Sequence, residues 1–75
     1  MYELLKRITI EPDKLRGKPC IRGLRIRVQD VLEMLADGAT PADILESFPD
    51  LEAEDIRAAI AYAAAQLRGT VVIAA

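Results

Sequence analysis

A run of helix start and stop signals between residues 28 and 67 constrains the fold of this 75-residue chain more than any other feature. It begins with an apolar stripe at the helical spacing i, i+3, i+4, i+7, formed by Val28, Val31, Leu32 and Leu35. Gly38 follows the stripe, where a helix-ending glycine is expected. The sequence therefore predicts a first helix over about residues 28–37.

A second and a third helix are predicted after this glycine. Thr40, Pro41 and Asp43 supply a hydroxyl N-cap, a proline at the first helical position and an acid in the first turn. This short helix ends at Pro49, and a turn holding a buried Leu51 leads to a third helix over about residues 53–67, ended by Gly69. The apolar residues expected to face inward are Ile44, Leu45 and Phe48 in the second helix, and Ile56, Ala59, Ile60, Ala63 and Leu67 in the third. This order has the layout of a helix-turn-helix.

The segments on either side of the three helices are β-prone. Ile8–Ile10 alternates apolar and polar residues as a short strand does, and Arg22-Gly23 lies where a tight turn would join the arms of a hairpin over residues 20–28. Residues 70–73 could pair with Ile8–Ile10 or with another chain. We therefore predict a single α+β domain over 1–75: a β-rich basic lead-in (1–27), a helix-turn-helix core (28–67) and an apolar tail (68–75).

Charge is distributed unevenly between the two parts of the chain. Residues 1–27 hold eight of the ten basic and three of the twelve acidic residues, a local net charge of +5, whereas residues 28–75 carry −7. Such asymmetry indicates one face for an anionic partner and another for a different partner. Two solvated faces would explain the charges equally well.

The composition argues against an enzyme. The chain has no histidine and a single cysteine, Cys20, which is expected to be a small buried hydrophobe. No spacing proposes a metal site, a phosphate-binding loop or another cofactor site, so none is predicted. The longest apolar run, over residues 58–65, is far shorter than the ~20 residues that span a bilayer, and no secretory signal is recognised. We expect a cytoplasmic protein without catalytic residues.

The helix-turn-helix layout makes DNA a candidate partner. The third helix of such a motif enters the major groove, yet this one begins with Glu52, Glu54 and Asp55, which would repel phosphates. The candidate DNA-binding residues are therefore mostly in the lead-in: Lys18, Arg22, Arg25, Arg27 and Arg57. A solvated hairpin edge would account for the lead-in cations without any nucleic acid.

The third helix is apolar nearly all round, which is typical of a helix buried on more than one side. In a domain this small, a second chain is expected to cover the additional face, either another copy or a different protein. The candidate partner-binding residues are Ala58, Ala61, Tyr62, Ala65, Val71 and Ile73. The alternative is that alanine simply serves as a good surface helix former.

Residues from about 7 to 73 resemble domain-of-unknown-function family 433 of bacteria and archaea. The resemblance is carried by Gly17–Ile26 (GKPCIRGLRI), Leu32–Gly38 (LEMLADG), Ile44–Leu51 (ILESFPDL) and Glu54–Ala63 (EDIRAAIAYA). The first segment is the specific one, and the helical segments are more general.

The resemblance implies a winged-helix or homeodomain-like fold and a VapB-like antitoxin of a type II toxin–antitoxin pair. Such a protein would neutralise a PIN-like ribonuclease toxin and repress its own operon by binding operator DNA. The leading hypothesis is a dimeric antitoxin that binds its toxin through the third helix and tail. The competing hypothesis is a protein-interaction module, homodimeric or toxin-bound, without affinity for DNA.

Overall fold

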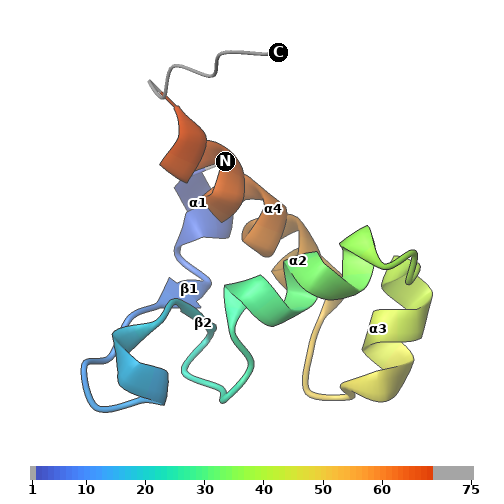
Figure 1. Ribbon diagram of the computed structural model, residues 1–75, viewed down its shortest axis with the longest axis horizontal. Coiled ribbons are helices and arrows are strands. Elements are labelled where there is room, and N and C mark those ends of the chain that lie inside the picture. The colour runs from blue at the N-terminus through green and yellow to red at the C-terminus, as the bar shows by residue number, and fades with distance from the viewer. Residues whose placement is uncertain (1, 69–75) are drawn as a thin grey trace.

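The computed structural model describes residues 2–68, in which helices predominate over a very small sheet (Figure 1). The elements in order are α1 (Tyr2–Leu5), β1 (Ile8–Thr9), a short turn η1 (Leu15–Gly17), β2 (Cys20–Ile21), α2 (Val28–Ala36), α3 (Pro41–Ser47) and α4 (Ala53–Leu67). β1 and β2 pair antiparallel, with Ile8 opposite Ile21 and Thr9 opposite Cys20. The protein is a small α+β fold, as predicted.

The three predicted helices are confirmed, together with the end signal of α2 and the start signals of α3. Gly38 has a φ of 99° and donates its N–H to the Leu35 carbonyl at 3.1 Å, while the N–H of Ala39 reaches the Met34 carbonyl at 3.0 Å. These two bonds form the glycine-dependent helix end known as a Schellman motif. At the start of α3, the Thr40 hydroxyl accepts from the Asp43 N–H at 3.1 Å, and the Asp43 carboxylate accepts from the Thr40 N–H at 2.9 Å. The end of α2 and the start of α3 therefore lie where local chemistry predicts them.

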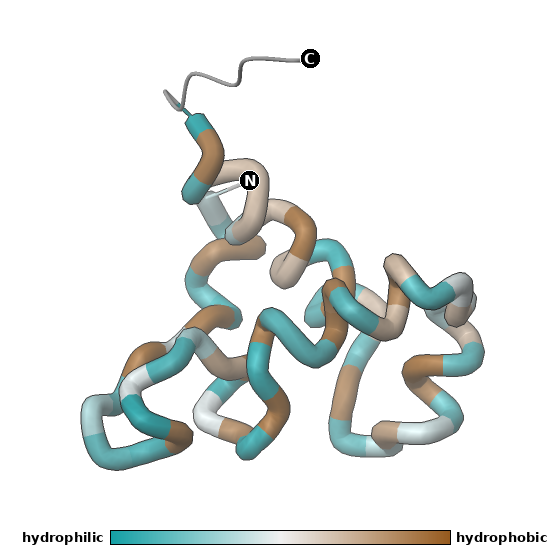
Figure 2. The backbone as a smooth tube through the Cα atoms, viewed as in Figure 1, coloured by the Kyte–Doolittle hydropathy of each residue, from teal (hydrophilic) through white to brown (hydrophobic). Residues whose placement is uncertain are grey.

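The core lies where α2, α3 and α4 meet the sheet. Its buried side chains are Ile21, Val28, Val31, Ile44, Leu51, Ile56 and Ala59. Leu45 and Phe48 pack against this cluster, and Cys20 is buried, all as predicted. In Figure 2 the tube of α2 alternates between hydrophilic and hydrophobic colours, while α4 is mostly pale brown because of its alanines. α2 is thus clearly amphipathic, whereas the composition of α4 does not indicate which of its faces points inward.

The lead-in contains less β structure than the sequence indicated. The tight turn is confirmed, since Arg22 and Gly23 have φ values of 43° and 72° and the Leu24 N–H reaches the Ile21 carbonyl at 2.7 Å. Beyond the turn the second arm pairs only through an isolated bridge between Cys20 and Arg27, because the regular partner of β2 is β1. Strands of two residues and an irregular arm replace the predicted hairpin over 20–28.

The inner face of α4 was predicted incorrectly at two positions. Ile60 and Leu67 are 50% and 62% exposed, whereas Ala58 and Ala61 are buried. The physical reason is α1, a helix that was not predicted: it packs against α4 and covers a second flank of that helix. Figure 1 shows α1 beside the C-terminal half of α4.

Several predictions concern residues outside 2–68. They are the helix-ending role of Gly69, the strand pairing of residues 70–73, and the partner contacts of Val71 and Ile73. Among the helices within 2–68, none combines the length and the apolar character that crossing a membrane requires.

Candidate functional site

The N-terminus of α4 holds a fully buried carboxylate, that of Asp55, with no exposed side-chain area. Arg22 donates to both of its oxygens, with Nε to Oδ1 at 3.0 Å and Nη2 to Oδ2 at 2.8 Å. Arg7 adds Nη1 to Oδ1 at 2.9 Å, and the Glu52 N–H adds a bond to Oδ2 at 2.8 Å. One carboxylate therefore joins the segment after α1, the turn after β2 and the start of α4.

The electrostatics of this cluster favour the charged carboxylate. Burial acts to raise the pKa of Asp55, but the hydrogen bonds from Arg22, the Glu52 N–H and Arg7 outweigh it, so the pKa lies below its usual value. The Arg22 guanidinium also donates to the Asp50 carbonyl at 2.7 Å. Every buried polar side-chain atom among residues 2–68 has a hydrogen-bond partner, so the cluster is a closed structural network with no open coordination position.

The predicted DNA-binding cations do not form one surface of free charges. Arg22 is committed to Asp55, Arg27 to Asp30 at 2.7 Å, and Arg57 to Glu54 at 3.0 Å. Only Lys18 and Arg25, of the five, lack an ion pair with any residue from 2 to 68. Carboxylates thus already neutralise three of the five predicted cations, which leaves little free positive charge for contacts with a phosphate backbone.

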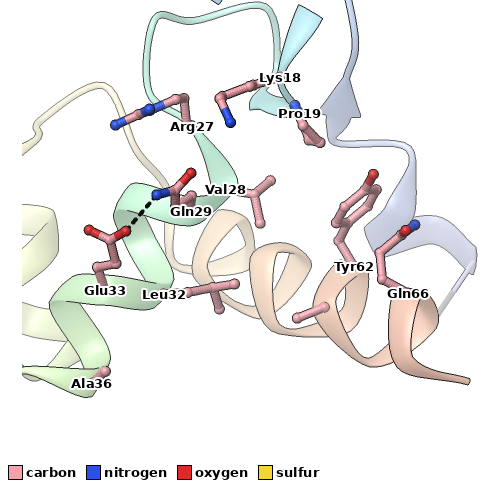
Figure 3. A pocket seen from close by; sticks show the side chains of 11 residues that line it. Lys18, Pro19, Arg27, Val28, Gln29, Leu32, Glu33, Ala36, Tyr62 and Gln66 are labelled. Carbon is pink, nitrogen blue, oxygen red and sulfur yellow. Dashed lines mark hydrogen bonds between the residues drawn. The ribbon is translucent and has the colours of Figure 1, made fainter. Parts of the chain in front are cut away.

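An apolar groove runs between α2 and α4 and encloses about 460 Å³ (Figure 3). Its lining residues are Lys18, Pro19, Arg27, Val28, Gln29, Leu32, Glu33, Ala36, Tyr62, Ala63 and Gln66. The polar side chains lie at the rim, where the Gln29 amide donates to the Glu33 carboxylate at 2.7 Å. A groove of this volume with an apolar floor and a polar rim is typical of a binding surface.

Cations gather at one end of the groove. Figure 3 shows Lys18 and Arg27 at the same end, near the start of α2. Both residues also line a smaller adjoining hollow of about 220 Å³ together with Leu15 and Arg16. The turn η1 brings Arg16 there, and its three residues all have positive φ. The groove therefore has an apolar body and one positively charged end.

The predicted partner-binding residues are only partly accessible. Tyr62 lines the groove, and Ala65 is half-buried, but Ala58 and Ala61 are buried within the chain itself and cannot form a partner surface. Sequence reasoning missed the α2 side of the groove because it assigned Val28 and Leu32 to the inner stripe alone. Ala36, which continues their spacing to i, i+4, i+8, was the available signal. Among residues 2–68 no group of three or more histidine, cysteine or acidic side chains is arranged to hold a metal ion.

Comparison with known proteins places this arrangement in a family. Residues 8–63 match the model of a protein family described as being of unknown function, DUF433. The chain belongs to the DUF433 family. In this DUF433 chain, the matched region includes β1, β2, α2, α3, Asp55 and most of the residues that line the groove.

Two relatives extend the comparison. The DUF433 chain is 46% identical over 63 residues to the uncharacterized protein y4eO of Sinorhizobium fredii (strain NBRC 101917 / NGR234), a match over 83% of this chain and 28% of that protein. It therefore spans little more than a quarter of the length of this relative. A crystal structure of a DUF433 member from Anabaena variabilis superimposes with a TM-score of 0.79 at 31% identity, over 91% of this chain and 67% of that one. The fold described above is thus one that a DUF433 member adopts in a crystal.

Proposed function

We propose that this chain is the antitoxin component of a type II toxin–antitoxin pair and that it neutralises a PIN-like ribonuclease toxin by binding it in the groove between α2 and α4. Membership of DUF433 and the resemblance described above suggest the class of function. The observation that carries the proposal is the groove, because it is an apolar surface between two helices that this chain leaves uncovered within residues 2–68. In this proposal the chain acts by binding the toxin, and it contributes no catalytic residues.

The proposal predicts that a bulky charge in the groove prevents neutralisation of the toxin. Ala36 lines the groove and is exposed at the end of α2, where an arginine is compatible with the helix dipole. We expect Ala36→Arg to weaken binding to the product of the neighbouring gene by at least about tenfold and to restore its ribonuclease activity in proportion. Affinity is measured by calorimetry and activity on a single-stranded RNA substrate.

The matched control is Ala64→Arg, the same substitution at an exposed position of α4 on the flank next to Leu4 and Ile60. This variant is expected to bind and to neutralise as the parent chain does. Equal loss in both variants, or in neither, would show that the groove is not the binding surface. No complex between the parent chain and the neighbouring product would overturn the proposed antitoxin function.

Operator binding is a second candidate function, supported by one specific observation. Lys18 and Arg25 have no carboxylate partner among the described residues, so both are available to phosphates. The paired states of Arg22, Arg27 and Arg57 limit the positive charge that such a surface could offer. The proposed DNA contact would therefore be weak in the absence of a toxin or a second copy.

A gel shift on the DNA upstream of the gene tests this second function. The parent chain is expected to retard that DNA, with affinity that falls steeply as salt increases. A double variant Lys18→Ala and Arg25→Ala should bind more weakly and with a salt slope smaller by about two, because two phosphate contacts are lost. Lys6→Ala, at an exposed lysine paired with Glu3, serves as the control for charge alone. Retardation that is unchanged in the double variant would exclude these two residues as DNA contacts.

A further inference from the structure

The shape of the groove restricts what can occupy it. Its floor is formed by side chains from two helices, with Val28, Leu32 and Ala36 on α2 and Tyr62 and Ala63 on α4. The α2 wall extends over eight residue steps, about 12 Å at the rise of an α-helix. An amphipathic helix that packs along two others buries its apolar stripe between them. The residues that it inserts lie at i, i+3 or i+4, and i+7 of its own sequence. The groove therefore accommodates about two turns of an amphipathic helix.

The charge at the end of the groove restricts the occupant further. Arg16 and Lys18 are exposed and form no ion pair with the residues from 2 to 68. Arg27 is charged as well, but its ion pair with Asp30 offsets that charge locally. Asp30 also accepts from the Arg27 N–H at 3.1 Å and so caps α2. Two uncompensated cations beside an apolar floor would repel a basic segment and attract a carboxylate.

We propose that the occupant of the groove is a short amphipathic helix of the partner protein that carries acidic side chains at the end seated against Arg16 and Lys18. This inference rests on the proposed function for the source of the helix, and it specifies the chemistry of that helix. The C-terminal end of an α-helix carries partial negative charge. We assign the acidic side chains to the last turn of the docked helix, so that their charge and the partial negative charge of that helix end both face Arg16 and Lys18 beside the start of α2.

Two synthetic helical peptides test the inference without the toxin. Each has about 14 residues with leucines at i, i+4, i+7 and i+11, and they differ only in having glutamates or lysines in the last turn. Amide chemical shifts of the labelled chain are followed by NMR during titration. The acidic peptide is expected to shift Leu32, Ala36 and Tyr62 and to bind at least about fivefold more tightly than the basic peptide at low salt. Absence of shifts at these residues, or equal affinity for the two peptides, would overturn the inference.

Charge reversal at the groove end provides the matched variants. Lys18→Glu, at an exposed side chain, is expected to remove the preference for the acidic peptide. Arg25→Glu makes the same change in charge at an exposed residue that does not line the groove, and it should leave the preference intact. Loss of the preference in both variants, or in neither, would contradict the assignment of the acidic end to Lys18.

The neighbouring gene's product then separates this inference from the proposed function. A toxin complex that weakens with Lys18→Glu by at least about fivefold, but not with Arg25→Glu, supports both. If the acidic peptide binds selectively and no toxin complex forms, the antitoxin proposal fails and the chemistry of the groove stands. If the toxin binds the parent chain and Lys18→Glu equally well, the acidic-helix inference is wrong for that partner and the antitoxin proposal stands.

Discussion

Replacing Asp55 by asparagine is expected to lower the free energy of unfolding by about 3 kcal/mol, because it leaves two guanidinium groups without their shared carboxylate. An asparagine amide can accept at one oxygen, but its NH₂ group would face the donors of Arg22 or Arg7. Removal of one partner from a fully buried pair costs more, but Arg7 and Arg22 are 30% and 34% exposed, so water compensates part of the loss. Urea denaturation followed by circular dichroism measures the change. For a domain of this size it corresponds to a melting temperature lower by about 15 °C.

The matched control is Glu54→Gln in the same helical turn. Glu54 pairs with Arg57 at the surface, where ion pairs contribute little, so this variant should differ from the parent by less than about 0.5 kcal/mol. A loss of similar size in both variants would indicate a general effect of acidic residues at the helix N-terminus. A negligible loss in Asp55→Asn would show that the buried network does not stabilise the fold.

The pH dependence gives a second measure of the same pair. Because the pKa of Asp55 is lowered in the folded state, its contribution is complete above the unfolded-state value of about 4 and is lost as pH falls through the folded-state value. The parent chain should therefore lose stability as pH falls below about 4, and the difference between parent and Asp55→Asn should shrink over that range. Asp30 and Asp43 also have lowered pKa values, so the variant retains part of the acid sensitivity.

Sequence reasoning succeeded where structure is determined by neighbours in the chain. The bounds of α3 follow from Thr40, Pro41 and Asp43, which act within one turn, and the turn at Gly38 ends α2 through bonds that span three and five positions. The ion pairs of Asp55 join residues 33 and 48 positions apart, and no spacing rule relates such positions. The helix dipole was a sufficient local explanation for this acid, so its long-range role was missed.

The residues of the candidate site were also predicted only in part, because long-range packing determines which side chains are accessible. Of the residues predicted to contact a partner, Tyr62 lines the groove, whereas Ala58 and Ala61 are buried within the chain. Alanine has the same small apolar side chain on every face, so a helix rich in alanine carries no directional pattern. Which of its flanks is covered depends on α1, a four-residue helix too short for periodicity to reveal.

The cover that α1 provides leads to the second stability prediction. Ala58 is fully buried outside the main core cluster, on a helix against which α1 packs, and Leu4 lies beside the adjacent Ala61 around a shallow hollow. A leucine at position 58 adds three carbons where no space is left, so Ala58→Leu is expected to cost about 2 kcal/mol of unfolding free energy. Thermal denaturation monitored by circular dichroism measures this cost.

Ala64→Leu is the matched control, since it places the same side chain at an exposed position of the same helix. Leucine and alanine have similar helix propensities, so this variant should remain within about 0.5 kcal/mol of the parent. A large cost at position 58 alone means that the rest of the chain closes this flank of α4 in solution, so that Ala58 is not available to a partner. A cost near zero at both positions means that α1 does not cover Ala58, and this flank would then be open to a second chain.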